Sequence, residues 1–530
     1  MLRHINPKMP FAEVMRQLLY LLFGSVWLLG CPSGTSTKNA GPPVPTSFSG
    51  EALARTHCQS CHLFPDPSLL DKKTWQQGVL PNMEMRLGVS DAMPFTGMEY
   101  EDIMEVTKTN AYSDRPQLAK SDMQKIEQYY LSHAPDSLPD QHAKAPVEVG
   151  LRDFEATFFR LPNGGIPMVT HVKIDSIRQQ IAVAEQSGRV RIFNKNLHVL
   201  DSLQAATAVS DVLPLATDSY WVLTMGIMTP NDQQKGALYE LPPGKPAQLL
   251  LQGLRRPVEM TRTDLNADNR PDVLVCNYGN HAGSLSWYEF NGEKSLEHVL
   301  SARPGARCTH VADFNHDDRP DVIALMAQGL EGISLFYNEG NGSFSEKVLL
   351  SFPSVYGSSH LSVIDFDKDG DLDLLYANGD NADYSYVCKP YHGVRLYTND
   401  GKNHFKLAWF YPLNGAQQVE ARDFDGDGDL DIAAIAFFPD PRKPKEGFVY
   451  LKNEGSSTGI WRFSAHTFSK SEQGRWLTMD CGDMDGDGDD DIILGSYLRR
   501  GANRVAMLPN GLPGLVVLKN NTLRLRASAR

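Results

Sequence analysis

The sequence lacks an excess of positive charge, a long hydrophobic run, and the short motifs of zinc hydrolases and nucleotide-binding enzymes. Its 530 residues include 51 Lys and Arg against 64 Asp and Glu, a formal net charge of −13. This balance disfavours nucleic acid as a partner, because phosphates attract basic proteins. No H-E-x-x-H or glycine-rich phosphate loop occurs. The 41% of hydrophobic residues nevertheless predict globular domains with ample core.

One apolar run, Leu18–Gly30, follows several basic residues and is too short to span a bilayer, as is typical of a signal-peptide core. It ends in LLGC, which resembles the bacterial lipobox; the resemblance implies that Cys31 is lipidated. We therefore expect a bacterial cell-envelope lipoprotein on the periplasmic or outer-membrane (cell-surface) side. Residues 1–30 would be the signal peptide and residues 31–49 a flexible tether. An uncleaved short anchor or an ordinary secretory peptide would also export the protein.

Cysteine is scarce, with seven residues in the chain. Two of them lie in CQSCH, formed by Cys58, Cys61 and His62. This C-x-x-C-H pattern is typical of c-type haem attachment, in which two thiols bind the haem vinyls and the histidine binds the iron. A redox dithiol or a zinc half-site is the alternative, but zinc would need a second ligand pair, and no cysteine lies between Cys61 and Cys276. We predict one covalent haem c.

The surroundings of this motif favour a small all-α, cytochrome c-like domain over residues 50–134. A short helix is expected at Glu51–Thr56, and Ser121 is expected to cap a later helix. The letters LPNM, ending at Met83, are similar to the segment that presents the axial methionine in cytochromes c, which implies Met83 as the distal ligand. Three other methionines remain alternatives: Met85, Met93 and Met98.

Internal repeats begin near residue 166. A glycine followed by alternating apolar residues, usually ending in Asn, recurs seven times at spacings typical of four-stranded propeller blades. Each copy is predicted to be the third strand of a blade. The copies begin at Gly188, Gly236, Gly283, Gly332, Gly393, Gly447 and Gly514.

A second element, D-x-[DN]-x-D-x-x-x-D, precedes the last five copies. Oxygen ligands at this spacing resemble the start of an EF-hand loop and suit Ca²⁺. The chain then continues into β-branched, apolar strands, so each loop should join two strands. The predicted ligands are Asp264, Asn266, Asp268 and Asp272; Asp313, Asn315, Asp317 and Asp321; Asp365, Asp367, Asp369 and Asp373; Asp423, Asp425, Asp427 and Asp431; Asp483, Asp485, Asp487 and Asp491.

These two elements together resemble FG-GAP and VCBS-type repeats over roughly residues 166–520. The resemblance implies a mainly β fold, a seven-bladed β-propeller whose calcium loops link the first and second strands of a blade. Blades three and four carry Asn269 and Asp318 where Gly is usual, so weaker binding is expected there. Blades one and two keep one acid each, near Asp175 and Asp211, and the ceiling is five Ca²⁺ ions. The alternative is that these loops are solvated acidic turns.

The remaining boundaries follow from these assignments. Residues 135–165 are expected to be a linker with a possible closure strand, and residues 166–530 the propeller. The composition of 134–150 leaves the geometry between haem and propeller open. Four further cysteines are expected to be buried and reduced, three of them in strands: Cys276, Cys308, Cys388 and Cys481.

No catalytic set is recognised. Polar residues expected on the innermost strands are candidates, although a solvated channel produces such a ring by default: Glu259, Cys308, His360, Gln418 and Thr478, with His310 and Glu420. We therefore expect electron transfer by the haem, with the propeller docking a redox protein, a polysaccharide or a small-molecule ligand. The alternatives are a periplasmic dehydrogenase resembling quinohaemoproteins, and an adhesion or surface-recognition module.

Overall fold

The computed structural model describes residues 43–529 except 93, 163–164, 293, 382–386, 458–459 and 499–511. The predicted signal peptide, Cys31 and Met93 therefore lie outside the described residues. Within the described part of the chain, no helix is long and apolar enough to cross a bilayer.

Residues 43–134 form a helical module. Its core holds Trp75 and Tyr130, whose ring centroids lie 4.4 Å apart, together with Leu53, Ile126 and the Cys58 thiol. The elements are α2 (Gly50–His57), η1 (Cys58–Ser60), η2 (Pro67–Leu69), α3 (Lys72–Thr74), the π-turn η3 (Trp75–Val79), α4 (Leu80–Arg86), α5 (Tyr100–Val106) and α6 (Lys120–His133).

The N-terminal caps differ between the two helices that the sequence predicted. Ser49 caps α2, and its Oγ accepts a hydrogen bond from the Ala52 N–H. In α6 the N-cap is Ala119, without a side-chain bond, so the expectation for Ser121 is wrong. Leu118 and Ala119 are buried, and their packing fixes where α6 begins.

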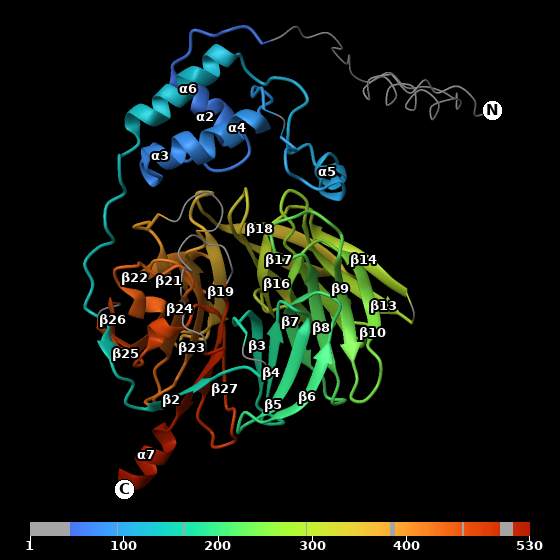
Figure 1. Ribbon diagram of the computed structural model, residues 1–530, viewed down its shortest axis with the longest axis vertical. Coiled ribbons are helices and arrows are strands. Elements are labelled where there is room, and N and C mark those ends of the chain that lie inside the picture. The colour runs from blue at the N-terminus through green and yellow to red at the C-terminus, as the bar shows by residue number, and fades with distance from the viewer. Residues whose placement is uncertain are drawn as a thin grey trace, which may run out of the picture. The chain divides into compact units, whose positions relative to one another are not determined.

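The propeller consists of seven sheets, each built mainly from consecutive strands. In Figure 1 the colour of the strands changes gradually around the propeller, as expected for consecutive segments. The blades are β3 (Val169–Asp175), β4 (Gln180–Glu185), β5 (Arg189–Asn194), β6 (Val199–Gln204); β7 (Ala208–Pro214), β8 (Tyr220–Gly226), β9 (Gly236–Leu241), β10 (Gln248–Leu254); β11 (Pro257–Thr263), β12 (Asp272–Asn277), β13 (Ser284–Asn291), β14 (Lys294–Ser301); β15 (Ala306–Ala312), β16 (Asp321–Met326), β17 (Gly332–Gly340), β18 (Ser343–Ser351); β19 (Ser358–Ile364), β20 (Asp373–Asn378), β21 (Gly393–Asn399), β22 (Phe405–Pro412); β23 (Ala416–Arg422), β24 (Asp431–Ala436), β25 (Phe448–Ser457), β26 (Ile460–Thr467); and β27 (Trp476–Gly482), β28 (Asp491–Ser496), β29 (Leu515–Asn520).

The two ends of the propeller sequence meet in the seventh blade. Strand β2 (Phe154–Phe159) pairs antiparallel with β29 and supplies the fourth strand, alongside the C-terminal strands in Figure 1. Strand β1 (Glu148–Val149) pairs in parallel with β26 at the outer edge of blade six. Helix α7 (Thr522–Ala529) follows β29.

The sequence repeats have the predicted places in the blades. Each glycine-led segment forms a third strand, and the five acidic loops join first and second strands in blades three to seven. Apolar residues of neighbouring sheets interdigitate, as where Trp221 and Leu223 of blade two pack in one cluster with Val275 of blade three. The core therefore lies between blades. The predicted seven-bladed, mainly β propeller is confirmed.

Every innermost strand has a register irregularity at the same place. The residue that follows it is His171, Asp211, Glu259, Cys308, His360, Gln418 or Thr478 in blades one to seven. Asp211 thus lies within β7, and its interpretation as the remnant of an acidic loop is wrong. The actual loop of blade two begins at Leu215.

Candidate functional site

The C-x-x-C-H motif lies where α2 ends and η1 begins. Cys58 is buried and packs in the module core, whereas Cys61 is exposed. Burial raises the pKa of the Cys58 thiol to about 11. His62 Nδ1 lies 2.8 Å from the Leu63 carbonyl oxygen, which can only accept, so Nδ1 carries the proton. The tautomer with its proton on Nδ1 presents a lone pair on Nε2, the usual arrangement for a metal-binding histidine.

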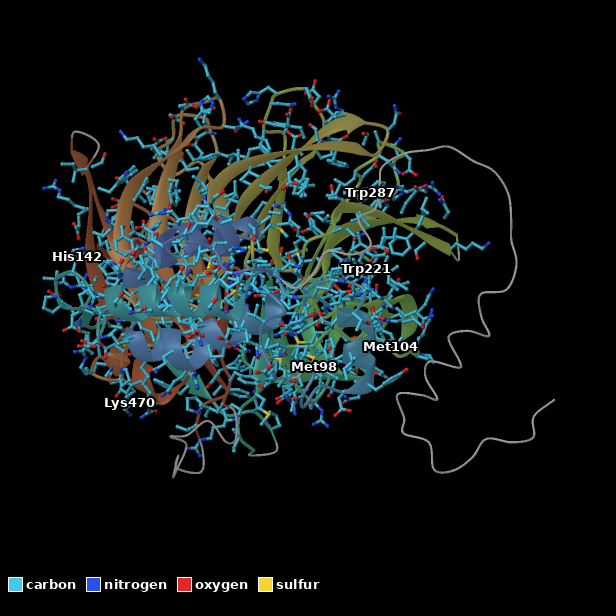
Figure 2. All side chains as sticks on the ribbon, turned by 90° about the horizontal axis from the view of Figure 1, so that it is seen from above. Met98, Met104, His142, Trp221, Trp287 and Lys470 are labelled. Atoms are coloured by element: carbon cyan, nitrogen blue, oxygen red, sulfur yellow. The ribbon has the colours of Figure 1, made fainter. Side chains whose placement is uncertain are left out.

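The methionines proposed as distal ligands differ in position. Met83, in α4, is partly buried and packs against the core cluster that contains Cys58. Met85, also in α4, and Met98 are partly exposed and lie outside that cluster; Figure 2 labels Met98. Cys58 and Met83 belong to one apolar cluster, whereas Cys61 is exposed and His62 is half-buried beside it in the chain. Two thiols, an imidazole and a thioether are the donor types that hold a c-type haem.

The helical module contacts the propeller through the acidic face of α5. The two Asp102 oxygens accept hydrogen bonds from Asp232 N–H at 2.8 Å and Gln233 Nε2 at 3.1 Å. Glu105 pairs with Arg255 at 2.9 Å, and the exposed Glu101 pairs with Lys235. Burial alone would raise the pKa of Glu105, but hydrogen bonds from Lys108, Arg255 and Gln234 outweigh it and lower the pKa to about 2.

A second contact joins Tyr112 of the module to His281 between β12 and β13. Tyr112 Oη lies 3.1 Å from His281 Nε2, and His281 Nδ1 lies 2.9 Å from Asp232 Oδ2. The other Asp232 oxygen accepts the backbone N–H groups of residues 280–282. The buried Asp232 therefore orients the histidine that meets the module. The sequence offered no signal for this group, since its members lie far apart in the chain.

The segment between the module and the propeller, residues 135–149, is fastened to blades five and six. Gln141 Nε2 donates to the His392 carbonyl at 2.8 Å. Lys144 pairs with Glu446 at 3.0 Å and lies over the Tyr411 ring. The sequence left this geometry open because a Pro- and Ala-rich composition does not reveal such long-range partners. These contacts hold residues 135–149, the strap, against the propeller.

In three of the five acidic loops, those of blades four, five and seven, the acid at position 9 makes the same two hydrogen bonds. Asp321 accepts from Phe314 N–H with Oδ2 and from Asn338 N–H with Oδ1. Asn338 Nδ2 donates to the Leu265 carbonyl of the preceding blade. Loops at Asp373 and Asp491 repeat the two carboxylate bonds. In these loops the ninth acid therefore joins the loop to the third strand through a backbone N–H, while the Asn338 side chain donates to the main-chain carbonyls of Leu265 and Pro320.

The loops divide into two groups by what surrounds their carboxylates. In blades three and four, Arg270 and Arg319 pair with Asp268 and Asp317, so a guanidinium already neutralises the fifth position. In blades five to seven, three carboxylates of each loop offer oxygens within 4.8 Å of one another: Asp365, Asp367 and Asp373; Asp423, Asp425 and Asp427; Asp483, Asp485 and Asp491.

The clustered carboxylates fit a divalent cation. Among the described residues, Asp365 Oδ1 and Asp485 Oδ1 are buried and have no hydrogen-bond partner. Burial, followed by the neighbouring carboxylates, raises the pKa of Asp491 to about 7. Asp425 and Asp485 each contact one lysine, Lys452 and Lys519 respectively. Each cluster thus concentrates negative charge that lysine offsets only in part, and hard oxygen ligands suit Ca²⁺.

The polar residues of the inner strands mainly join neighbouring blades. Glu259 Oε1 accepts from Thr309 N–H at 2.7 Å, and Gln418 exchanges two hydrogen bonds with the Met479 backbone. His310 Nε2 lies 2.8 Å from the Leu361 carbonyl. Burial raises the pKa of Glu259 to about 8 and lowers that of His360 to about 3. His171 and Asp211 belong to the same ring; the sequence analysis missed them because it counted back from loop aspartates.

Comparison with known families identifies FG-GAP-like repeats over residues 264–324, 313–376 and 377–434. These spans cover blades three to five and the start of blade six, so the predicted FG-GAP repeats are confirmed there. No curated protein sequence matches the chain.

Two solved structures are similar in outline. The WD40 domain of Neurospora crassa Pan2 has 10% identity and a TM-score of 0.43, covering 70% of this chain and 97% of that chain. A structure of BBS1N in complex with ARL6DN has 9% identity and a TM-score of 0.43, covering 69% of this chain and 96% of that chain.

Proposed function

We propose that the protein is an exported, lipid-anchored c-type haem protein that transfers electrons, while its calcium-stabilised propeller provides a docking surface. The observation that carries the proposal is the set of Cys58, Cys61 and His62 with the His62 Nδ1 proton held by the Leu63 carbonyl. Haem c, when bound, would supply one-electron chemistry. His62 would present Nε2 to it, and Met83 is the proposed opposite ligand.

The contacts between module and propeller support a fixed mounting of the redox centre. Asp102, Glu105 and Tyr112 engage blades two and three, and the strap of residues 135–149 engages blades five and six. Two separate points of contact restrict rotation of the helical module relative to the propeller more than a single point would. A redox partner docked on the propeller would therefore meet the haem module in one orientation, and steady electron transfer depends on such an orientation.

The acidic loops would bind calcium for stability. They lie in blades three to seven and connect strands, and their ninth acids already join neighbouring elements. The three clusters of blades five to seven are the proposed principal sites, and the arginine-paired loops at Asp268 and Asp317 are weaker candidates. The partner on the propeller is proposed to be a redox protein, a polysaccharide or a small-molecule ligand.

The covalent haem is tested by staining a denaturing gel for haem. Exported wild-type protein should retain the stain, and Cys58→Ala/Cys61→Ala should lose it, because a thioether-linked haem survives unfolding. A variant of Cys276, a buried thiol far from the motif, is the matched control and should keep the stain. Absence of stain in the wild type would refute the haem assignment.

The lipid anchor has its own test. Cys31→Ser should move the exported protein from the detergent phase to the aqueous phase, because the diacyl chains are the proposed bilayer anchor. An unchanged detergent fraction would contradict lipidation of Cys31.

A periplasmic dehydrogenase is the second candidate function. The inner-strand ring favours it, because burial raises the pKa of Glu259 to about 8, so this carboxyl holds a proton near neutral pH, as a general acid must. A panel of alcohols and sugars added to the oxidised holoprotein separates the two functions. Only the dehydrogenase would reduce its own haem, whereas electron transfer alone would leave the spectrum oxidised.

A further inference from the structure

Blade two carries a cavity where blades three to seven carry an acidic loop. The cavity is open, has a volume of about 450 Å³, and lies at the turn between β7 and β8. This volume is within the range of small-molecule sites. The residues of its lining that could contact a ligand through polar or apolar side chains are Leu213, Leu215, Thr217, Trp221, Glu240 and Arg262.

The wall of this cavity is held in place from two sides. Arg178 of blade one pairs with Asp218 at 2.8 Å and also contacts the Leu215 carbonyl. Thr217 Oγ1 lies 2.8 Å from Ser219 Oγ, which donates to Glu240 Oε1 at 2.9 Å. The turn is therefore fixed by its own partners, and a ligand would not have to order it.

One cation and one orphaned donor belong to the lining. The Arg262 guanidinium lies 5.4 Å from the centroid of the Trp221 ring, is exposed, and has no carboxylate partner among the described residues. Trp221 is 7% exposed, and within the same part of the chain its Nε1 has no hydrogen-bond partner. Figure 2 labels Trp221. Buried indole N–H groups usually find an acceptor.

The chemistry of this lining selects a class of ligand. Leu213, Leu215 and the indole provide an apolar wall, and Arg262 provides a fork that matches a carboxylate. Glu240 in the same lining repels a dianion such as phosphate more strongly than a monoanion, because Coulomb repulsion grows with the charge of the ligand. A singly charged organic acid with a ring satisfies both conditions.

We propose that the cavity binds a monocarboxylate carried on a ring, with the carboxylate on Arg262 and the ring against the apolar wall. This chemistry is shared by sugar acids and by aromatic acids. The inference rests on the proposed binding role of the propeller, but it requires neither haem nor calcium, and haem staining can therefore fail while this site binds.

Calorimetric titration of the full-length exported protein with sodium glucuronate and with sodium benzoate tests the site. We expect saturable binding of at least one of the two, and Arg262→Gln should weaken it about tenfold or more, because a charge-assisted hydrogen bond is lost. Arg262→Lys should recover part of the affinity. Arg462→Gln is the matched control: it removes an exposed arginine of β26 and should bind as the wild type does.

Comparison of the two titrations shows which class of acid the cavity binds. Preference for glucuronate indicates a sugar acid, and preference for benzoate indicates an aromatic acid. Arg262 is exposed, so its substitution should leave the melting temperature unchanged, and a melting curve of each variant checks the fold. Absence of binding by the wild type, or equal affinity of wild type and Arg262→Gln, would overturn the proposal.

Discussion

Tyr112 Oη lies 3.1 Å from His281 Nε2, so a residue of the helical module and a residue of the propeller, 169 positions apart, share one hydrogen bond. Asp232 holds the other ring nitrogen of His281 at 2.9 Å. The protein thus joins its two parts through a contact whose propeller half, His281, is oriented by Asp232 of the propeller.

The first prediction concerns this contact. Tyr112→Phe and His281→Ala should each destabilise the module, and their combined effect should differ from the sum of the two by about 0.5–1.5 kcal/mol, because both remove the same hydrogen bond. Calorimetric unfolding of the two single variants and the double variant measures this coupling. Tyr100→Phe is a control, because Tyr100 is 74% exposed and should have no effect. Additive effects would contradict a direct contact.

The second prediction concerns the distal haem ligand. Met83→His should convert a methionine-ligated spectrum to a bis-histidine spectrum, because Met83 packs on the cluster that contains Cys58. Met98→Leu should leave the spectrum unchanged. Optical spectra of both variants, oxidised and reduced, provide the comparison. If the methionine band survives Met83→His, the ligand is one of Met85, Met93 and Met98.

The third prediction concerns calcium. Asp427→Ala should lower the melting temperature of the calcium-loaded propeller more than Asp268→Ala does, because Arg270 already neutralises Asp268. One site at 100 times its dissociation constant contributes about 2.7 kcal/mol. Calorimetry with and without EGTA measures the difference, which chelation should abolish. If both variants lower the melting temperature equally when calcium is present, the two loops do not differ in calcium binding as predicted.

The fourth prediction concerns pH. Burial raises the pKa of Glu259 from its ordinary 4.5 to about 8, so the folded protein keeps a proton that the unfolded chain releases above pH 4.5. The free energy of unfolding should therefore fall as the pH rises from about 4.5 to 8, by at most about 1.4 kcal/mol per pH unit from this group.

Glu259→Gln should make that fall shallower, because glutamine has no proton to release and keeps an oxygen for the Thr309 N–H. Urea unfolding at several pH values, with calcium present, gives the slopes. Glu472→Gln, at an exposed site, should leave the slope as in the wild type. A slope that Glu259→Gln does not alter would mean that this carboxyl is ionised in the folded protein.

The sequence by itself determined the repeat architecture. The glycine-led segments and the D-x-[DN]-x-D-x-x-x-D loops encode local structure, since strand alternation and turn chemistry act over fewer than ten residues. For the same reason the strand positions of Cys276, Cys308 and Cys481 could be predicted, and all three are buried and unpaired.

Only the tertiary structure determined which residues the strands and loops of each repeat contact. In the folded protein Asp211 lies in a strand, and Arg270 and Arg319 pair with acids of their loops. The strap of residues 135–149 binds to blades five and six, and Tyr112 contacts His281. Such partners depend on contacts between residues far apart in the chain, which no local pattern records. The physical reason is that hydrogen bonds and charge pairs need proximity in space, and only the closed propeller supplies it.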